Sequence, residues 1–182
     1  MRKFIASVVV LMLSPMIHAQ KLSLSVNLLD CAALGTLNAD MSYTLARRWS
    51  VDVGVRYNPF TFRRGTRQFQ MRQQSYAAGV RLWPWHTLSG WWFASKLRYQ
   101  EYNFGGIVSS QAQEGDRFGV GLYAGYTHMI SRHFNIEFGM GAWAGTDFYR
   151  RYSCTVCGTT VAEGAKTFVL PDDLAISIVY VF

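Results

Sequence analysis

The sequence is poor in charge and lacks any apolar run long enough to form a membrane-spanning helix. Only 16% of its 182 residues are charged, and no run approaches the ~20 apolar residues that such a helix needs. No internal repeat with a period of about 20–50 residues is present, which excludes a solenoid. Half of the residues are hydrophobic and 15% are aromatic, and this composition excludes a disordered chain.

Acidic residues are also scarce. The 11 Asp and Glu residues stand against 18 Lys and Arg, which gives a formal net charge of +7. A basic balance can indicate a nucleic-acid partner, but here the positive charges are scattered through apolar alternation and do not gather on one helix face. We therefore expect no nucleic-acid binding.

The N-terminus has the features of a cleavable export signal. Arg2 and Lys3 precede a short apolar run, and Ala19 offers a small residue for cleavage. We predict a signal peptide over residues 1–19 and one domain over residues 20–182. An exported chain without a helical anchor is either soluble in the cell envelope or a membrane β-barrel.

Eight segments alternate between apolar and polar residues with a period of two, which is typical of β-strands. In the clearest one, from Trp49 to Asn58, every odd-numbered residue is apolar and every even-numbered residue is polar or glycine. The eight expected strands cover, in chain order, residues 22–28, 37–45, 49–58, 75–82, 91–100, 117–126, 134–141 and 174–182.

Connection lengths between these segments are uneven. Three short connections lie at residues 46–48, 84–90 and 131–132. The longer connections cover residues 30–35, 60–70, 103–115 and 151–173. Short turns at one end and long loops at the other are typical of outer-membrane barrels. We therefore predict an all-β fold, an eight-stranded antiparallel transmembrane β-barrel with short periplasmic turns and longer external loops.

The glycines indicate which face points inward. Eight of them share the parity of the polar residues, and none of these lies on the apolar face: Gly54, Gly79, Gly119, Gly121, Gly125, Gly139, Gly141 and Gly145. Glycine weakens a strand and serves no steric need on a water-facing exterior, whereas the narrow interior of a small barrel needs small residues. The polar face is therefore expected inside. This favours a membrane barrel over a soluble, lipocalin-like ligand-binding barrel, which stays an alternative.

Aromatic residues cluster at the ends of the expected strands, as in the interfacial girdles of membrane barrels. Those near the short turns are Trp49, Trp83, Trp85 and Trp91, and those near the long loops are Tyr57, Phe60, Tyr99, Tyr102 and Phe118. The chain ends in Val179-Tyr180-Val181-Phe182, which resembles the terminal aromatic signal of outer-membrane barrels. We therefore expect the outer membrane of a Gram-negative bacterium, with its lipid and lipopolysaccharide as surroundings.

An eight-stranded barrel has only enough interior for its own side chains. We predict a network of inward-pointing charges that plugs it, because unpaired buried charges are costly. Its members are Asp40, Asp52, Arg56, Arg81, Lys96, Arg98 and Glu137. A solute pore is not expected.

Two further groups of residues fall in the predicted external loops. Cys154 and Cys157 are spaced to form a tight-loop disulfide, while a zinc knuckle or thiol redox chemistry stay open as alternatives. A basic loop holds Arg63, Arg64, Arg67 and Arg72 with no acidic residue among them. Such a loop can bind lipopolysaccharide phosphates or an acidic partner, and the alternative is a solvated loop.

An enzyme acting on outer-membrane lipid needs a Ser, a His and an acid near the external leaflet. His86, His128 and His133 all fall near the short turns instead. We therefore expect no catalytic residue, no cofactor-binding residue and no metal site. An outer-membrane lipid-modifying enzyme stays the alternative.

Several motifs resemble one family of small outer-membrane proteins. They are Trp49-Ser50-Val51-Asp52, Tyr57-Asn58-Pro59-Phe60, Tyr102 to Ile107, Tyr149 to Gly158, and Ala175 to Phe182. The chain resembles the Bacteroides-type β-barrel family catalogued as domain of unknown function 3575. The resemblance implies an outer-membrane barrel without established activity. Members are often linked with fimbrial systems, so it implies a non-enzymatic accessory, anchoring or surface-interaction protein with a fimbrial or surface-assembly partner.

Overall fold

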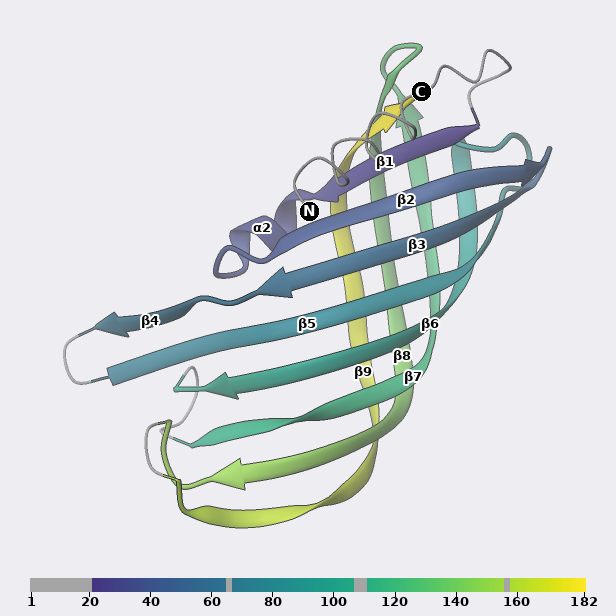
Figure 1. Ribbon diagram of the computed structural model, residues 1–182. Helices are drawn as coiled ribbons and strands as arrows, with labels where there is room; N and C mark the ends of the chain where they lie inside the picture. Colours follow the sequence, from purple (N-terminus) through teal and green to yellow (C-terminus); the bar gives the residue numbers. More distant parts are fainter. Residues whose placement is uncertain (1–20, 65–66, 107–110, 156–157) are drawn as a thin grey trace, which may run out of the picture.

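A computed structural model describes residues 21–64, 67–106, 111–155 and 158–182. In this part of the chain, nine antiparallel strands and one five-residue helix follow one another (Figure 1). Their bounds are β1 Leu22–Asn27, α2 Leu28–Ala32, β2 Leu37–Ala46, β3 Trp49–Asn58, β4 Thr61–Arg64, β5 Arg67–Leu82, β6 Gly90–Gly105, β7 Ala112–Met129, β8 Phe134–Tyr152 and β9 Thr160–Val181. Among these residues, the structure contains no helix that is long and apolar enough to cross a membrane.

The strands form one sheet that closes on itself. Its order is β3-β2-β1-β9-β8-β7-β6-β5-β4, and an additional pairing of β3 with β5 closes a ring of eight strands. The short β4 pairs with β5 beyond the end of β3 and stands outside the ring. The predicted all-β, antiparallel class is therefore confirmed, with a ring of eight strands.

The ring closes with a large stagger between its strands. Following the cross-strand partners of Ser25 through β2, β3, β5, β6, β7 and β8 leads to Phe168 on β9. Ser25 itself pairs directly with Val179, eleven positions further along β9. A stagger of this kind requires strands that tilt strongly against the axis of the ring. Figure 1 shows the tilt as strands crossing at steep angles on the near and far sides.

Strand lengths differ from the sequence prediction on one side of the ring. β2 and β3 keep nearly the expected bounds, whereas β5 to β9 contain 16 to 22 residues and run far past the ring mouth. Most of the long loops predicted at 60–70, 103–115 and 151–173 are therefore strands, and that part of the prediction was wrong. Polar residues occupy both faces of these extensions, so apolar alternation does not mark them.

The first predicted strand and loop also need correction. The chain leaves β1 at Asn27, whose side-chain oxygen accepts a hydrogen bond from the backbone N–H of Leu29 at 3.1 Å and caps α2. The turn after the helix places Leu34 and Gly35 at positive φ, which returns the chain into β2. The helix α2 contacts β9 at the ring mouth.

Candidate functional site

A buried ion-pair triad lies inside the ring. The Arg81 Nε atom lies 2.7 Å from an Asp52 carboxylate oxygen, and an Arg81 Nη1 atom lies 2.8 Å from a Glu137 oxygen. Thr127 donates a further hydrogen bond to the same Glu137 oxygen at 2.8 Å. All four side chains are buried. Three predicted network members from β3, β5 and β8 thus meet at one point.

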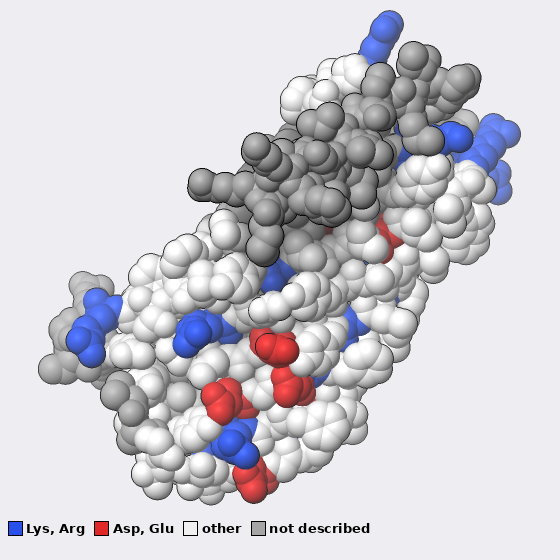
Figure 2. All heavy atoms as spheres, viewed as in Figure 1, with Lys and Arg blue, Asp and Glu red and all other residues white. Residues whose placement is uncertain are grey.

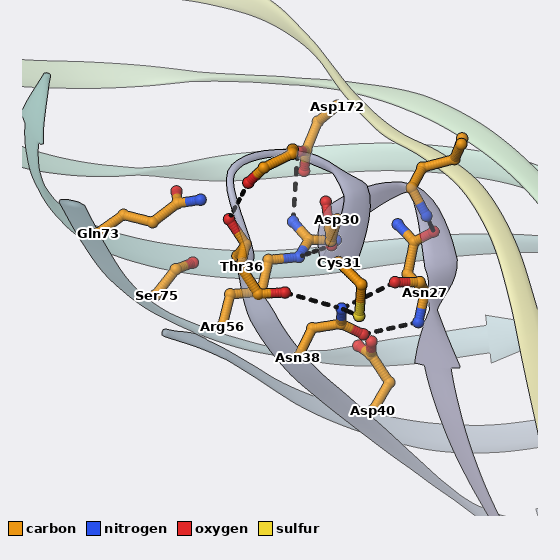
Figure 3. Close-up of polar contacts among 12 residues, drawn as sticks. Asn27, Asp30, Cys31, Thr36, Asn38, Asp40, Arg56, Gln73, Ser75 and Asp172 are labelled. Atoms are coloured by element: carbon orange, nitrogen blue, oxygen red, sulfur yellow. Dashed lines mark hydrogen bonds and ion pairs between the residues drawn. The ribbon is translucent and has the colours of Figure 1, made fainter. Parts of the chain in front are cut away.

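A second cluster lies nearer the ring mouth and centres on Asp172. Its carboxylate accepts from the Arg98 guanidinium and from Tyr123 Oη, the latter at 3.0 Å, and lies 3.4 Å from Arg56 Nη1. Arg56 also pairs through Nε with Asp30 of α2 at 2.8 Å. Figure 3 shows Asp30 and Asp172 converging on Arg56.

The last two predicted members, Lys96 and Asp40, lie beside this cluster with 3.9 Å between Lys96 Nζ and Asp40 Oδ1. All seven predicted residues therefore point into the ring. Their partners differ from the expected ones in one respect, because Arg56 and Arg98 both pair with Asp172, which the predicted network did not include. Sequence reasoning missed Asp172 and Asp30.

A β-bulge explains the position of Asp172. Gly139 pairs with Ala175 while Gly141 pairs with Asp172, so β9 holds one extra residue at this point. An extra residue reverses the parity of the side chains that follow it. Inward-facing positions are odd-numbered from Ala175 to the C-terminus and even-numbered before the bulge, where Phe168 and Asp172 point inside. The signal was present in sequence as a proline in a strand, followed by a shift in apolar parity.

Aromatic rings fill the space between the charged groups. The Arg81 guanidinium lies 4.1 Å from the Trp92 ring centre, Lys96 Nζ lies 5.2 Å from that of Tyr123, and the Arg98 guanidinium lies 5.0 Å from that of Trp143. Cations over aromatic faces are attracted by the ring quadrupole. These residues are buried, with the three aromatic side chains 3 to 4% exposed.

Interior glycines make room for these rings. A Cβ atom at Gly125 would lie 2.3 Å from the Trp92 ring, and one at Gly121 would lie 2.2 Å from Tyr123 Oη. A small cavity near Lys96 has a volume of only about 10 Å³, which is room for about one water. The described interior is thus a packed column of aromatic, charged and small residues.

Two aromatic residues expected in the girdles lie inside. Trp83 is fully buried, and its Nε1 donates to Ser50 Oγ at 3.1 Å. Tyr102 is 4% exposed and donates to Asp147 Oδ1 at 2.8 Å. Trp83, directly after β5, and Tyr102, on β6, both continue the parity of inward-facing residues, which outweighs their place near a strand end.

The outer face of the ring carries a belt of exposed apolar side chains. Its members, here called the apolar belt, are Leu24, Val26, Leu37, Met41, Tyr43, Leu45, Trp49, Val53, Val55, Tyr57, Tyr76, Val80, Trp91, Phe93, Leu97, Phe118, Val120, Leu122, Tyr126, Phe134, Phe138, Met140, Val169, Leu174, Ile176, Ile178 and Tyr180. Aromatic pairs such as Trp91–Tyr126 and Phe134–Tyr180, with ring centres 5.4 and 5.2 Å apart, lie near its short-turn end.

The belt has a sharp polar border towards the protruding strands. Outward positions change from Tyr99 to Glu101 along β6 and from Phe118 to Asp116 along β7. Tyr99 Oη lies at this border, 3.0 Å from a Glu101 oxygen and 3.2 Å from an Asp116 oxygen. The exterior therefore has two zones, one apolar around the ring and one charged above it.

The predicted basic loop is a protruding hairpin formed by β4 and the start of β5. Phe62 stacks on Phe69 with ring centres 5.6 Å apart, and Arg63 and Arg72 are exposed. Arg64 and Arg67 are cross-strand partners near the tip, and their side chains lie outside the described part.

The cysteine and histidine predictions have mixed outcomes. Cys157 lies outside the described residues, so the disulfide with Cys154 stays a prediction. His86, His128 and His133 are exposed at the short-turn end, as expected. Within the described ranges, no group of three or more His, Cys, Asp and Glu side chains is placed to hold a metal ion.

A comparison with known proteins identifies the family of this chain. The chain matches the family described as "Protein of unknown function (DUF3575)" over residues 5–182, essentially its whole length. The chain belongs to this family. The resemblance inferred from the sequence motifs is thereby confirmed, while the DUF3575 description itself assigns no activity. No match was found among curated proteins or among solved structures.

Proposed function

We propose that the eight-strand ring is a β-barrel that crosses the outer membrane of a Gram-negative bacterium. The short turns would face the periplasm and the long strands the outside. The apolar belt carries this proposal. Along β6 the belt residues Trp91, Phe93 and Leu97 and the border residue Tyr99 span about nine residues, and a tilted strand needs ~9–11 residues to cross the apolar core.

The free-energy cost of exposing apolar surface to water supports lipid as the surroundings of the apolar belt. Soluble monomers rarely expose apolar patches larger than a few hundred Å², because each Å² in water costs roughly 25 cal/mol. A soluble ligand-binding barrel needs the opposite arrangement, with apolar side chains inside and polar ones outside. Here the ion pairs of Arg81 and Arg98 occupy the interior, and residues such as Leu122, 69% exposed, occupy the exterior.

The packed interior favours a role in binding another protein rather than in transporting solutes. We propose a non-enzymatic accessory or anchoring protein whose outward parts bind a fimbrial or surface-assembly protein. The β4–β5 hairpin is the proposed contact, because it presents exposed Phe62 and Arg63 beyond the ring, with exposed Phe60 directly before β4. Exposed aromatic and arginine side chains are the types that dominate protein interfaces.

Placement is tested by fractionation and reconstitution. The protein should co-sediment with outer membranes, resist extraction with carbonate, and migrate differently on gels before and after heating. Vesicles containing it should show no swelling in small-solute gradients. Recovery in the soluble periplasm would overturn the placement, and rapid swelling would overturn the plugged interior.

The contact role is tested by affinity purification from native outer membranes in mild detergent. A tag beside Gly158 should be tolerated, because that residue is exposed and a Cβ there meets no atom within 4 Å. A fimbrial or surface-assembly protein should co-purify, and F62S/R63E should lose it while R48E, in the opposite turn, keeps it. Recovery of the barrel alone would contradict the role.

The enzymatic alternative has a separate readout. A deletion strain should keep unchanged lipid A and phospholipid profiles, since no catalytic step on lipid is proposed. A changed profile that returns to normal with the intact gene would overturn the non-enzymatic assignment.

A further inference from the structure

The outer face of the protruding strands carries a groove of about 950 Å³. Two cross-strand rows with outward parity line it. The row nearer the apolar belt holds Gln74, Glu101, Asp116 and Phe148, and the next row holds Arg72, Asn103, Glu114, Arg150 and Glu163. Figure 2 shows charged side chains gathered over this part of the molecule, while most of the rest of the described surface in this view is white.

This groove begins directly where the apolar belt ends. The neighbouring outward row on the ring side is Tyr76, Tyr99 and Phe118, which are cross-strand partners on β5, β6 and β7. In the proposed membrane placement, the groove therefore lies at the level of the outer-leaflet headgroups. A molecule seated in it could also contact the apolar belt without a gap.

The groove is built from groups that bind hydroxyls. A hydrogen-bonded ladder crosses four strands, in which Gln70 donates to Asn103 at 2.5 Å, Asn103 donates to Glu114 at 3.1 Å, and Tyr152 donates to the other Glu114 oxygen at 2.5 Å. The ladder holds amide and carboxylate groups in fixed positions on one face of the sheet. Carboxylates accept hydrogen bonds from sugar hydroxyls, and side-chain amides both accept and donate them.

Two arginines flank these groups at opposite sides of the groove. Arg72 is exposed, and the described residues give it no acidic partner. Arg150 pairs with Glu163 at 3.2 Å and also bonds Tyr152, but the side chains of the ion pair are both more than half exposed, so the pair contributes little stability. Guanidinium groups bind phosphate with paired hydrogen bonds.

Charge in the groove limits its ligand. Four carboxylates, on Glu101, Glu114, Asp116 and Glu163, outnumber the two arginines. A glycerol headgroup offers only two hydroxyls beside its phosphate, whereas a phosphorylated disaccharide offers enough hydroxyls to meet the four carboxylates while its phosphate meets the arginines. We propose that this groove binds the phosphorylated saccharide headgroup of an outer-leaflet glycolipid, with its acyl chains on the apolar belt. The inference rests on the proposed membrane placement.

The test uses the mature protein in detergent micelles and native mass spectrometry. The probe is an acylated glucosamine disaccharide monophosphate, compared with its dephosphorylated form, with the non-acylated disaccharide phosphate and with phosphatidylglycerol. The intact protein should retain the probe at least ten-fold better than each comparison compound. R72Q/R150Q should lose at least ten-fold, whereas R47Q/R48Q in the opposite turn should retain it. Both pairs are exposed, so the variants should fold alike.

Several outcomes would overturn the inference. Equal retention of phosphatidylglycerol would mean a non-selective lipid surface, and equal binding of the non-acylated compound would remove the belt from the site. Equal loss in R72Q/R150Q and R47Q/R48Q would mean a general charge effect. If the protein inserts into membranes but shows no preference, this inference alone fails; if it does not insert, the placement fails as well.

Discussion

Arg81 and Asp52 pair inside the ring with 2.7 Å between Nε and Oδ2, and the same guanidinium reaches Glu137 on the other side of the interior. One cation therefore joins β3, β5 and β8. Removing Arg81 would leave two buried carboxylates without a counter-charge. This costs more free energy than replacing all three charged residues with neutral ones.

Arg81→Met should destabilise the folded protein by about 3–5 kcal/mol. The measurement is guanidinium-induced unfolding from lipid vesicles, followed by tryptophan fluorescence. Arg48→Met, at an exposed turn, is the matched control and should change little. The triple variant Arg81→Met, Asp52→Asn, Glu137→Gln should recover part of the loss. An Arg81→Met variant as stable as the control would refute the role of the triad.

Because of the bulge in β9, we expect assembly of the ring to depend strictly on the number of residues in this strand. Deleting residue 173 removes the extra position between the partners of Gly139 and Gly141, so the preceding part of β9 must invert its faces or shift register. Either change exchanges buried Phe168 with exposed Val169. We expect the deletion to prevent assembly, read by loss of the heat-modifiable gel band. Normal assembly of the deletion variant would show that the bulge is dispensable. Deleting Thr159, outside the strands, should be tolerated.

The interior glycines should differ in their tolerance of alanine. A Cβ at Gly125 would lie 2.2 Å from the backbone oxygen of Phe138, whereas at Gly139 the nearest atoms are those of the Trp92 ring at 3.0 Å. Gly125→Ala should cost about 1–3 kcal/mol and Gly139→Ala less. Adding Trp92→Phe should relieve most of the cost of Gly139→Ala but only part of that of Gly125→Ala, because the contact with the Phe138 backbone oxygen stays. Unfolding midpoints check this order, and equal costs would contradict it.

The apolar belt predicts a depth-dependent cost of charge. Leu122→Arg, in the middle of β7, should weaken folding into vesicles by about 2–4 kcal/mol, while Val161→Arg on the protruding part of β9 should cost about 0–1 kcal/mol. Both native side chains are exposed, 69 and 57%. Similar small costs at both positions would indicate that the belt faces water.

The polar ladder outside the belt predicts one alkaline transition. The hydrogen bond to the Glu114 carboxylate raises the pKa of Tyr152 above its ordinary value of about 10. The folded chain thus holds this phenolic proton more tightly than the unfolded chain. The stabilisation from this bond is complete below about pH 10 and is lost as the pH rises through the raised pKa. Ultraviolet titration should show that Tyr152→Phe lacks one late-titrating phenolate and that Glu114→Gln shifts it earlier. Identical curves would contradict the assignment.

Alternation in the sequence predicts the ring well because each ring strand has one apolar face. The bounds of β3 and the inward position of glycines such as Gly121 follow from parity alone. The protruding strands lack that contrast, since Glu101 and Tyr102 are both hydrogen-bonding residues on opposite faces. These segments are strands because they pair with neighbouring strands, and the residue pattern within one segment does not show this pairing.

The interior network shows a similar division. Parity assigns the charges of β2, β3, β5, β6 and β8 to the interior, but their pairing depends on how strands meet across the ring. Asp172 enters only because the bulge changes its face, and Asp30 only because the chain turns into α2. Both are departures from regular strand geometry, so a prediction built on regular strands leaves them out.

The unequal strand lengths give the molecule a one-sided rim. On the long-strand side β1 to β3 end early, with α2 between β1 and β2, while β5 to β9 extend well beyond them (Figure 1). A molecule that approaches over the shorter strands meets the inward face of the extended strands, and one that approaches from the other side meets the polar ladder. The rotation of the protein about the axis of the ring therefore decides whether a neighbouring molecule meets the inward face of the extended strands or the polar ladder.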